Sequence, residues 1–387
     1  MLGRGVATKI VQNRSPKHFS RSLSSPSLQR KKTTVPGFVN DRLKEMQLEI
    51  ASQFVNDVPA PTTIYKPSSQ LPTTSEDFTK NLERMAKYYF DQGGKMFRPS
   101  VALLVANACN LAAPSDMKNR LECGEEAISV NQYKIGMICE MIHTASLVHD
   151  DVIDGADTRR GNASVNALWG NKMAVLVGDF ILARATQVLC SIGRPNVISV
   201  MATIIEDLVM GEFMQMTAKN GAVDSQLDDY MEKTYKKTAS LFANSCRSVA
   251  ILAEASEDLQ FQAAEYGRHL GLAFQLVDDL LDFVSSAADM GKPVAADLKL
   301  GLSTAPVIFA AQQSSELQEL MARKFSQEGD PNRARELVLE SDGMQKARSL
   351  AQKHASEAAK LASAFPNPTG VADVLVEYAL AQLDRRS

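Results

Sequence analysis

The sequence predicts an all-α protein with one helical domain spanning residues 41–387. Long stretches rich in alanine, leucine and methionine are separated by short turn signals such as Gly93-Gly94 and Gly161-Asn162. Alternating apolar and polar runs joined by hairpin turns, which would predict β-strands, are missing from the sequence. Two aspartate clusters, far apart in the chain, both lie in apolar helical stretches, and a division into two domains would separate them.

Bulk composition narrows the class of protein. The formal net charge is -3, so no global attraction to nucleic acid is expected. No uninterrupted run of about eighteen apolar residues occurs, so we expect no transmembrane helix. The 5 cysteines are scattered without metal-ligand spacing, which is typical of reduced core residues in an intracellular protein.

The first segment, residues 1–40, is basic and serine-rich and contains no aspartate or glutamate. This composition is typical of an organelle transit peptide, and a disordered basic tail is the alternative. It lacks the long apolar stretch of a secretory signal peptide. We therefore predict a disordered mitochondrial transit peptide over residues 1–40 and a protein of the matrix or the inner-membrane surface.

The helical domain is predicted to begin with an amphipathic helix over residues 41–55. Its apolar positions recur every three or four residues, at Leu43, Met46, Ile50 and Phe54. Prolines between residues 59 and 72 then predict an extended connection. A second helix is expected to start at Thr74 or Ser75, because acidic residues follow a capping side chain there.

The next signal is the turn Gly93-Gly94-Lys95-Met96-Phe97-Arg98-Pro99. It combines flexible glycines, two cations and a proline suited to the first turn of a helix, so it fits an anion site at a helix start. It differs from a P-loop in its glycine spacing and in lacking Ser or Thr after the lysine. A capped turn with solvated charges is the alternative.

The aspartate clusters carry the strongest chemical signal. Each has the pattern DDxxD, and the six residues are Asp150, Asp151, Asp154, Asp278, Asp279 and Asp282. On a helix the first and last carboxylates of such a cluster share a face. Like charges in an apolar setting repel each other, and a hard divalent cation offsets that cost. We therefore predict that both clusters face one cavity and hold Mg²⁺ on a diphosphate.

Several other polar residues have two interpretations. Arg159 and Arg160 follow the first cluster and either bind phosphate oxygens through guanidinium forks or form an exposed basic turn. His143 is either a hydrogen-bonded core residue or part of the site. Lys237 either pairs with an anion or extends its charged end to solvent. Lys292 lies either in a loop that closes over a phosphate or in a solvated surface loop.

The order of these motifs resembles that of the trans-isoprenyl diphosphate synthases. The resemblance rests on GGKMFRP, EMIHTASLVHDDVIDGADTRRG, GDFILARA, GEFMQ, KTASLFANSC, FQLVDDLLDF and GKPVAADLKLG. Within the family the chain is most similar to catalytic subunits of decaprenyl or solanesyl diphosphate synthases. The resemblance implies an isoprenoid-synthase type helical bundle around a deep central cavity. It also implies successive addition of isopentenyl diphosphate to an allylic diphosphate, which supplies the ubiquinone side chain.

The resemblance also implies roles for single residues. The six aspartates would hold Mg²⁺, and Lys237 would join them in catalysis. Isopentenyl diphosphate would be bound by Lys95, Arg98, His143 and Arg160. The allylic diphosphate, farnesyl or geranylgeranyl, would be bound by Arg159, Lys237, Thr238, Gln275 and Lys292. Many relatives carry a third basic residue where this chain has Met96, which weakens the expected phosphate contacts.

Product length follows from the helix that carries the first cluster. Residues before Asp150 should point progressively deeper into the cavity. Ala145 and Ser146 are small, so they should let a growing chain pass, and Ile142 and Met141 should line the walls beyond. We therefore predict a product longer than the C20 class.

Four other interpretations stay open at this point. The chain could be a non-catalytic or regulatory subunit of a prenyl synthase hetero-oligomer, a short-chain (C15 or C20) synthase, a terpene cyclase, or an HD-type phosphohydrolase. Retention of all six aspartates disfavours the regulatory subunit, and only 5 histidines disfavour the hydrolase. The expected assembly is a homodimer or a hetero-oligomer with a related second subunit, without nucleic acid, and with peripheral membrane association as an option for product release.

Overall fold

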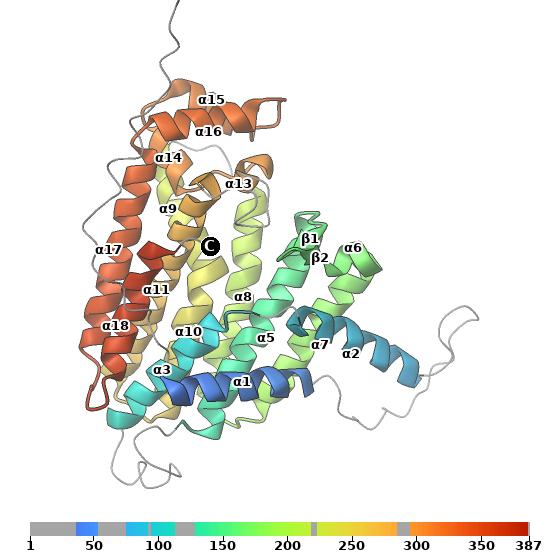
Figure 1. Ribbon diagram of the computed structural model, residues 1–387, viewed down its shortest axis with the longest axis vertical. Coiled ribbons are helices and arrows are strands. Elements are labelled where there is room, and N and C mark those ends of the chain that lie inside the picture. Colours follow the sequence, from blue (N-terminus) through green and yellow to red (C-terminus); the bar gives the residue numbers. More distant parts are fainter. Residues whose placement is uncertain are drawn as a thin grey trace, which may run out of the picture. The chain divides into compact units, whose positions relative to one another are not determined.

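The computed structural model describes residues 36–52, 75–91, 94–112, 128–217, 223–284 and 295–385. Within these ranges the chain is almost wholly helical (Figure 1), which confirms the predicted all-α class. The strands in these ranges are β1 (Thr158–Arg159) and β2 (Asn162–Ala163), which pair antiparallel. The sequence did not predict this hairpin, because strands of 2 residues are too short to show an alternating pattern.

Helices of very different length surround the core. In chain order they are α1 (Gly37–Ser52), α2 (Ser75–Asp91), α3 (Phe97–Ala112), α5 (Val130–Ile153), α6 (Val165–Trp169), α7 (Asn171–Cys190), α8 (Pro195–Thr217), α9 (Val223–Thr234), the π-helix η1 (Tyr235–Ala239), α10 (Ser240–Leu252), α11 (Glu257–Val284), α13 (Ala296–Lys299), α14 (Ala305–Ala311), α15 (Ser315–Ala322), α16 (Asp330–Glu340), α17 (Gly343–Ser363), α18 (Val371–Ala381) and η2 (Gln382–Asp384).

The first helix has the periodicity that the sequence predicted. Leu43, Met46 and Ile50 are buried on one face of α1, which packs against α3 and α5. α1 begins at Gly37, so the boundary that we predicted at residue 41 falls inside this helix. The predicted transit peptide up to residue 35, and Phe54, lie outside the described residues.

The centre of the bundle is formed by α10 and α11. α10 packs against α11, α3, α8 and α5, and α11 also packs against α17 (Figure 1). The close approach of α11 to α10 and to the preceding π-helix η1 depends on two glycines. A Cβ at Gly267 would lie 2.5 Å from the Phe242 carbonyl oxygen, and one at Gly271 would lie 2.6 Å from the Ala239 Cα. These contacts fix the position of α11, which carries the second aspartate cluster near its end, against its neighbours.

Helix α5 carries the first cluster and is held firmly at its start. Ser129 and Gln132 form a capping box, in which each side chain bonds the other's backbone N–H. The buried Gln132 amide also exchanges hydrogen bonds of 2.9 and 2.8 Å with Asn110 of α3. Because this end of α5 is fixed against α3, the position of its last turn, which holds the aspartates, is determined by tertiary packing.

Helix α7 is long and apolar, although the sequence analysis predicted no transmembrane helix. Among the described helices it alone has the length and mean hydropathy, 1.6, that a membrane span requires. The sequence did not predict this, because charges at Lys172, Asp179 and Arg184 interrupt its apolar run. α7 packs against α5, α6 and α2, and 33% of its apolar window is buried. Length and composition alone do not distinguish a membrane span from a bundle helix with one uncovered face.

Candidate active site

The first aspartate cluster lies where α5 ends. Asp154 is the C-cap residue, and its backbone N–H donates to the Asp150 carbonyl. Asp151 is 1% exposed, and both of its oxygens are engaged. The Tyr89 hydroxyl donates to Oδ2 at 2.5 Å, and Arg159 donates to Oδ1 from Nε at 2.9 Å. Asp151 is therefore held in one orientation by two elements that lie outside its own helix.

The β1–β2 hairpin directs the two arginines to different partners. Arg160 and Gly161 form its turn with φ angles of 53° and 79°, as a type I′ hairpin requires. Positive φ is costly for an arginine, and such strain is concentrated at functional sites. The turn leaves Arg159 on Asp151 and brings Arg160 to the glycine turn, where a Cβ at Gly94 would lie 3.4 Å from Arg160 Nη1.

Asp150 lies within reach of charges on η1, α8 and the hairpin. Burial raises the pKa of its carboxyl to about 6, with Lys237 lowering it and Glu212 and Asp154 raising it. Lys237 itself forms a short ion pair with Glu212. The first carboxylate therefore lies among mixed charges, and a further cation would offset the cost of its burial.

In the second cluster, Asp279 is the most deeply enclosed residue. It is 3% exposed and accepts hydrogen bonds from the Tyr230 hydroxyl at 2.6 Å and from Gln275 Nε2 at 2.9 Å. Burial nevertheless raises the pKa of Asp279 to about 6, although these hydrogen bonds and Lys233 lower it. Its charge is therefore only partly compensated by the protein.

The other two aspartates of α11 have separate partners. Asp282 is buried and accepts backbone N–H groups of Ala296 at 3.1 Å and Asp297 at 3.3 Å, so it holds the start of α13. Asp278 forms an ion pair of 2.7 Å with Arg385, close to the end of the chain. Lys292 lies between α11 and α13 in the sequence and is outside the described residues.

The two clusters meet through η1. The charge of Lys237 in this π-helix lowers the pKa of Asp150, and the hydroxyl of the next residue, Thr238, donates to Gln275 Oε1 at 2.9 Å. Gln275 in turn donates to Asp279. A short path of polar side chains therefore runs from one cluster to the other, as expected if both face a common site.

Residues of α8 hold the π-helix η1 in place. Lys236 donates to Asp207 at 3.1 Å and Ser240 donates to its other oxygen at 2.5 Å, so Asp207 holds both ends of the wide turn. Gly211, one turn further along α8, allows close approach, since a Cβ there would lie 2.6 Å from Lys237 Cγ. π-helical turns inside α-helices often occur at functional sites.

A second polar group joins α3 to α5. Arg98 Nη1 donates to His143 Nε2 at 3.0 Å, which assigns the ring proton to Nδ1. Burial lowers the pKa of His143 well below its usual value, and Arg98, Arg160 and Arg159 lower it further, so the ring is neutral. Glu140 is buried one turn before His143. Burial raises the pKa of Glu140, and the charges of Arg98 and Arg160 lower it. Lys95, three residues before Arg98 in the chain, is exposed.

The donor set fits a divalent cation shared with phosphate. In the described part of the chain no three His, Cys, Asp or Glu side chains are close enough to hold a metal alone. Mg²⁺ sites commonly use one or two carboxylates and complete their shell with water and substrate phosphate. The raised pKa values of Asp150 and Asp279 mark buried carboxylates that a cation would stabilise. The residues therefore fit the implied metal as a bridge to a phosphorylated ligand.

The predicted chain-length residues lie along the buried part of α5. Met141 and Ala145 are 0% exposed and Ile142 is 1% exposed, all within the main hydrophobic core. Ser146 is partly buried, and its hydroxyl donates to the His143 carbonyl at 2.8 Å. Whether they line a product channel stays a prediction.

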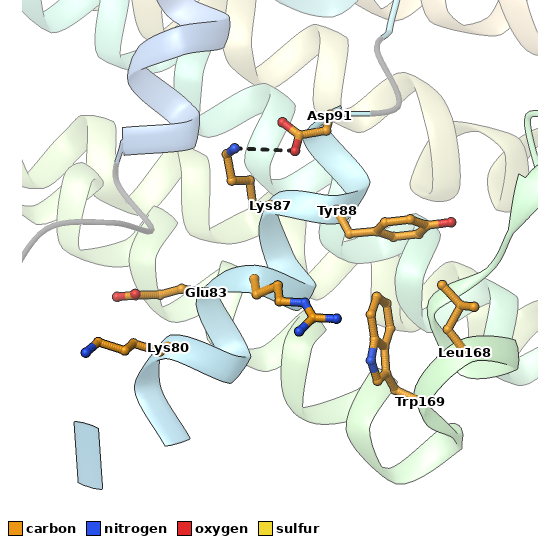
Figure 2. Close-up of a pocket in the computed structure, with 8 residues that line it drawn as sticks. Lys80, Glu83, Lys87, Tyr88, Asp91, Leu168 and Trp169 are labelled. Carbon is orange, nitrogen blue, oxygen red and sulfur yellow. Dashed lines mark ion pairs between the residues drawn. The ribbon is translucent and has the colours of Figure 1, made fainter. Parts of the chain in front are cut away.

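A cavity of about 690 Å³ lies elsewhere, between α2 and α6 (Figure 2). Its walls include Lys80, Arg84, Lys87 and Trp169, with Lys87 paired to Asp91 at 3.5 Å. None of the predicted site residues lines it. Because it is open to solvent and none of the six aspartates lines it, we do not assign the chemistry to it.

Sequence reasoning missed several residues of the site. Tyr89, Tyr230, Glu212 and Arg385 each bond a predicted residue, as described above. No local sequence pattern identifies a tyrosine in an amphipathic helix as a hydrogen-bond donor to a distant carboxylate. For Glu212 a signal existed, since a carboxylate in the GEFMQ segment is the expected partner of a lysine entering an apolar helix.

Comparisons with known proteins agree on one family. Residues 79–338 match the model of the family described as polyprenyl synthetase. The chain is 46% identical over 307 residues to "All trans-polyprenyl-diphosphate synthase PDSS1" of Homo sapiens, covering 79% of this chain and 71% of that protein. It is 45% identical over 291 residues to the decaprenyl-diphosphate synthase of Dictyostelium discoideum, covering 75% and 60% of the two chains.

Solved structures give the same result for the fold. A polyprenyl synthase from Caulobacter crescentus CB15, complexed with calcium and isoprenyl diphosphate, has a TM-score of 0.74 at 27% identity, covering 92% of this chain and 100% of that one. A decaprenyl diphosphate synthase from Rhodobacter capsulatus has a TM-score of 0.74 at 26% identity, covering 90% and 98%.

Proposed function

The chain belongs to the polyprenyl synthetase family and is a prenyltransferase, and from that premise we propose a specific reaction for it. The protein is a mitochondrial long-chain all-trans polyprenyl diphosphate synthase. It adds isopentenyl diphosphate units to farnesyl or geranylgeranyl diphosphate and supplies the ubiquinone side chain. A relative at 46% identity is named an all trans-polyprenyl-diphosphate synthase, and relatives at 43 to 45% are named decaprenyl, solanesyl or hexaprenyl synthases. The names of the hexaprenyl and solanesyl synthases include the word mitochondrial, and all of these relatives support this class.

We assign the allylic diphosphate to the region between the two clusters. Lys237 and Thr238 approach it from η1, Arg159 approaches it from the hairpin, and Gln275 supplies a polar contact from α11. Mg²⁺, held by aspartates of both clusters, would neutralise the leaving diphosphate. Isopentenyl diphosphate then belongs beside Arg98, His143, Arg160 and Lys95, where a neutral imidazole and buried guanidinium groups can bind an anion.

The protein's own contribution to the reaction is positioning and exclusion of water. Arg98 and His143 orient the isopentenyl double bond toward the allylic carbon, and Lys237 stabilises negative charge that develops on the leaving group. The apolar walls of α3, α5 and α10 keep water from quenching an electron-poor allylic carbon. The proton lost at the end of each cycle passes to the departing diphosphate.

The observation that carries this proposal is the chain of hydrogen bonds from Thr238 of η1 through Gln275 to Asp279, next to Lys237, whose charge acts on Asp150. It is tested by incubating the chain from Pro36 onward with labelled isopentenyl diphosphate, farnesyl diphosphate and Mg²⁺, with EDTA as the control. A product ladder that extends past C20 and disappears with EDTA supports the proposal. Absence of any elongated product, or a product that stops at C15 or C20, refutes it.

The chain-length assignment has its own test. Ala145→Phe places a ring on the buried face of α5, four residues beyond Met141. If this face lines the product channel, the variant makes shorter products at a similar initial rate. Val130→Phe, at an exposed position at the start of the same helix, is the matched control and should leave the product length unchanged. An unaltered length in Ala145→Phe refutes the assignment.

A partner subunit is proposed from an uncovered apolar face. Val209, Met210, Phe213 and Met216 of α8 are 47 to 62% exposed and lie on one side of the helix. Together with the uncovered face of α7, this surface fits a second copy of the chain. Sedimentation of wild type and Phe213→Glu tests it. A dimer that dissociates in the variant is expected, and a wild-type monomer contradicts the proposal. Binding only to a related chain or to vesicles would indicate the alternative partners.

A further inference from the structure

The last described residues, up to Arg385, reach the candidate active site. After α18, the short helix η2 packs against α11, α17 and α18. Gln382 is buried and donates to the Tyr378 carbonyl at 2.7 Å, and the Tyr378 ring stacks on Phe97 with centroids 5.7 Å apart. These contacts, none of which involves the side chain of Arg385, hold the tail beside the start of α3.

Arg385 is placed between the two substrate regions. Its Nη2 lies 2.7 Å from Asp278 Oδ1, and its guanidinium carbon lies 4.0 Å from the centroid of the Phe274 ring. The guanidinium carbon of Arg98 lies 5.5 Å from the same ring. Asp278 raises the pKa of Arg98 and Arg385 lowers it, although burial is the larger influence. The two arginines and Asp278 therefore form one electrostatic group around Phe274.

Both arginines have unused donors. Nη1 of Arg385 and Nε of Arg98 are buried and have no hydrogen-bond partner in the described part of the chain. A buried donor without a partner is costly, and that cost is removed when an anion accepts the hydrogen bond. A guanidinium that already pairs with a carboxylate through Nη2 can therefore still bind a phosphate oxygen through Nη1.

The pairing of Arg385 also affects the metal site. Asp278 is the first carboxylate of the second cluster, and a cation from the protein already neutralises it. A divalent cation that binds this carboxylate must compete with the guanidinium. This competition lowers the affinity of the site for the metal. When the metal binds, the guanidinium of Arg385 is released and lies next to Arg98.

We propose that Arg385 is a built-in counter-ion that neutralises Asp278 in the metal-free chain and binds the substrate diphosphate beside Arg98 once a metal takes over that carboxylate. This inference rests on the proposed function of the site. It adds a substrate-binding residue at the end of the chain and couples its action to metal binding. The stacking on Phe274 keeps the guanidinium in the site during this exchange.

The test compares the whole chain with Arg385→Gln in two measurements. Calorimetric titration with MgCl₂ alone should give about three- to ten-fold tighter binding in the variant, because the competing cation is gone. The KM for isopentenyl diphosphate should rise about ten-fold or more, because a charged hydrogen bond to the diphosphate is lost. Unchanged metal affinity or an unchanged KM in Arg385→Gln overturns the proposal.

Two further variants control the result. Arg194→Gln removes an exposed arginine that pairs with Glu254 at 3.4 Å, at the opposite end of α11, and should match wild type in both measurements. Arg385→Lys keeps the charge but not the planar fork, so metal affinity should return toward wild type while KM stays high. If the wild-type chain makes no elongated product, the proposed function fails, and the MgCl₂ titration still decides whether Arg385 competes for Asp278.

Discussion

Replacement of Gly211 by alanine tests how the π-helix η1 is positioned. The added Cβ would lie 2.6 Å from Lys237 Cγ and 3.1 Å from the Lys237 backbone nitrogen. The side chain can move aside, but the backbone contact requires α8 and η1 to separate. That separation pulls Lys237 away from Asp150 and strains the ion pair with Glu212.

The expected magnitude follows from two opposing effects. Alanine is favoured over glycine inside a helix by about 0.5–1 kcal/mol, and overpacking of a close contact costs about 1–3 kcal/mol. The net loss of unfolding free energy should therefore be roughly 0–2.5 kcal/mol, measured by urea denaturation. The displacement of Lys237 should lower kcat/KM for the allylic diphosphate about ten-fold or more, because a charged contact is weakened.

Gly37→Ala is the matched control for this experiment. Gly37 also lies in a helix, and a Cβ there would meet no atom within 4 Å. The control should therefore be neutral or slightly stabilising, with unchanged kinetics. If Gly211→Ala behaves like Gly37→Ala in both stability and kcat/KM, the close contact does not position Lys237 and the reasoning is refuted.

Three further predictions concern other parts of the molecule. Tyr230→Phe removes the 2.6 Å hydrogen bond to Asp279 and should lower kcat/KM roughly ten- to hundred-fold without loss of helix content by circular dichroism. Burial lowers the pKa of His354 to about 4 and also lowers that of His269, so stability is complete above about pH 6.5 and falls as the pH decreases toward 4. His354→Gln should flatten that fall in urea midpoints measured between pH 7 and pH 5, and an identical slope contradicts it. Gly267→Ala should cost about 1–3 kcal/mol, because its Cβ would meet the backbone of α10; a urea midpoint equal to that of wild type would show that the two helices can separate freely.

Much of the helical layout could be predicted from local patterns. The spacing of Leu43, Met46 and Ile50 predicted α1, and the acidic residues after Ser75 predicted the start of α2. The family also followed from motif order, because the types and spacing of the aspartates, arginines and lysines are local properties of the chain. The β1–β2 hairpin was not predictable in this way, since its strands are too short to show a period.

The sequence by itself determined which residue types carry the chemistry: paired aspartate clusters on apolar helices, and cations next to them. Only the tertiary structure decided how those charges are oriented and balanced. Tyr89 and Asp151 are 62 residues apart, and Tyr230 and Asp279 are 49 apart, yet each pair shares a short hydrogen bond. Such partners are selected by the packing of helices against one another, and helical periodicity carries information only about neighbours three or four residues away.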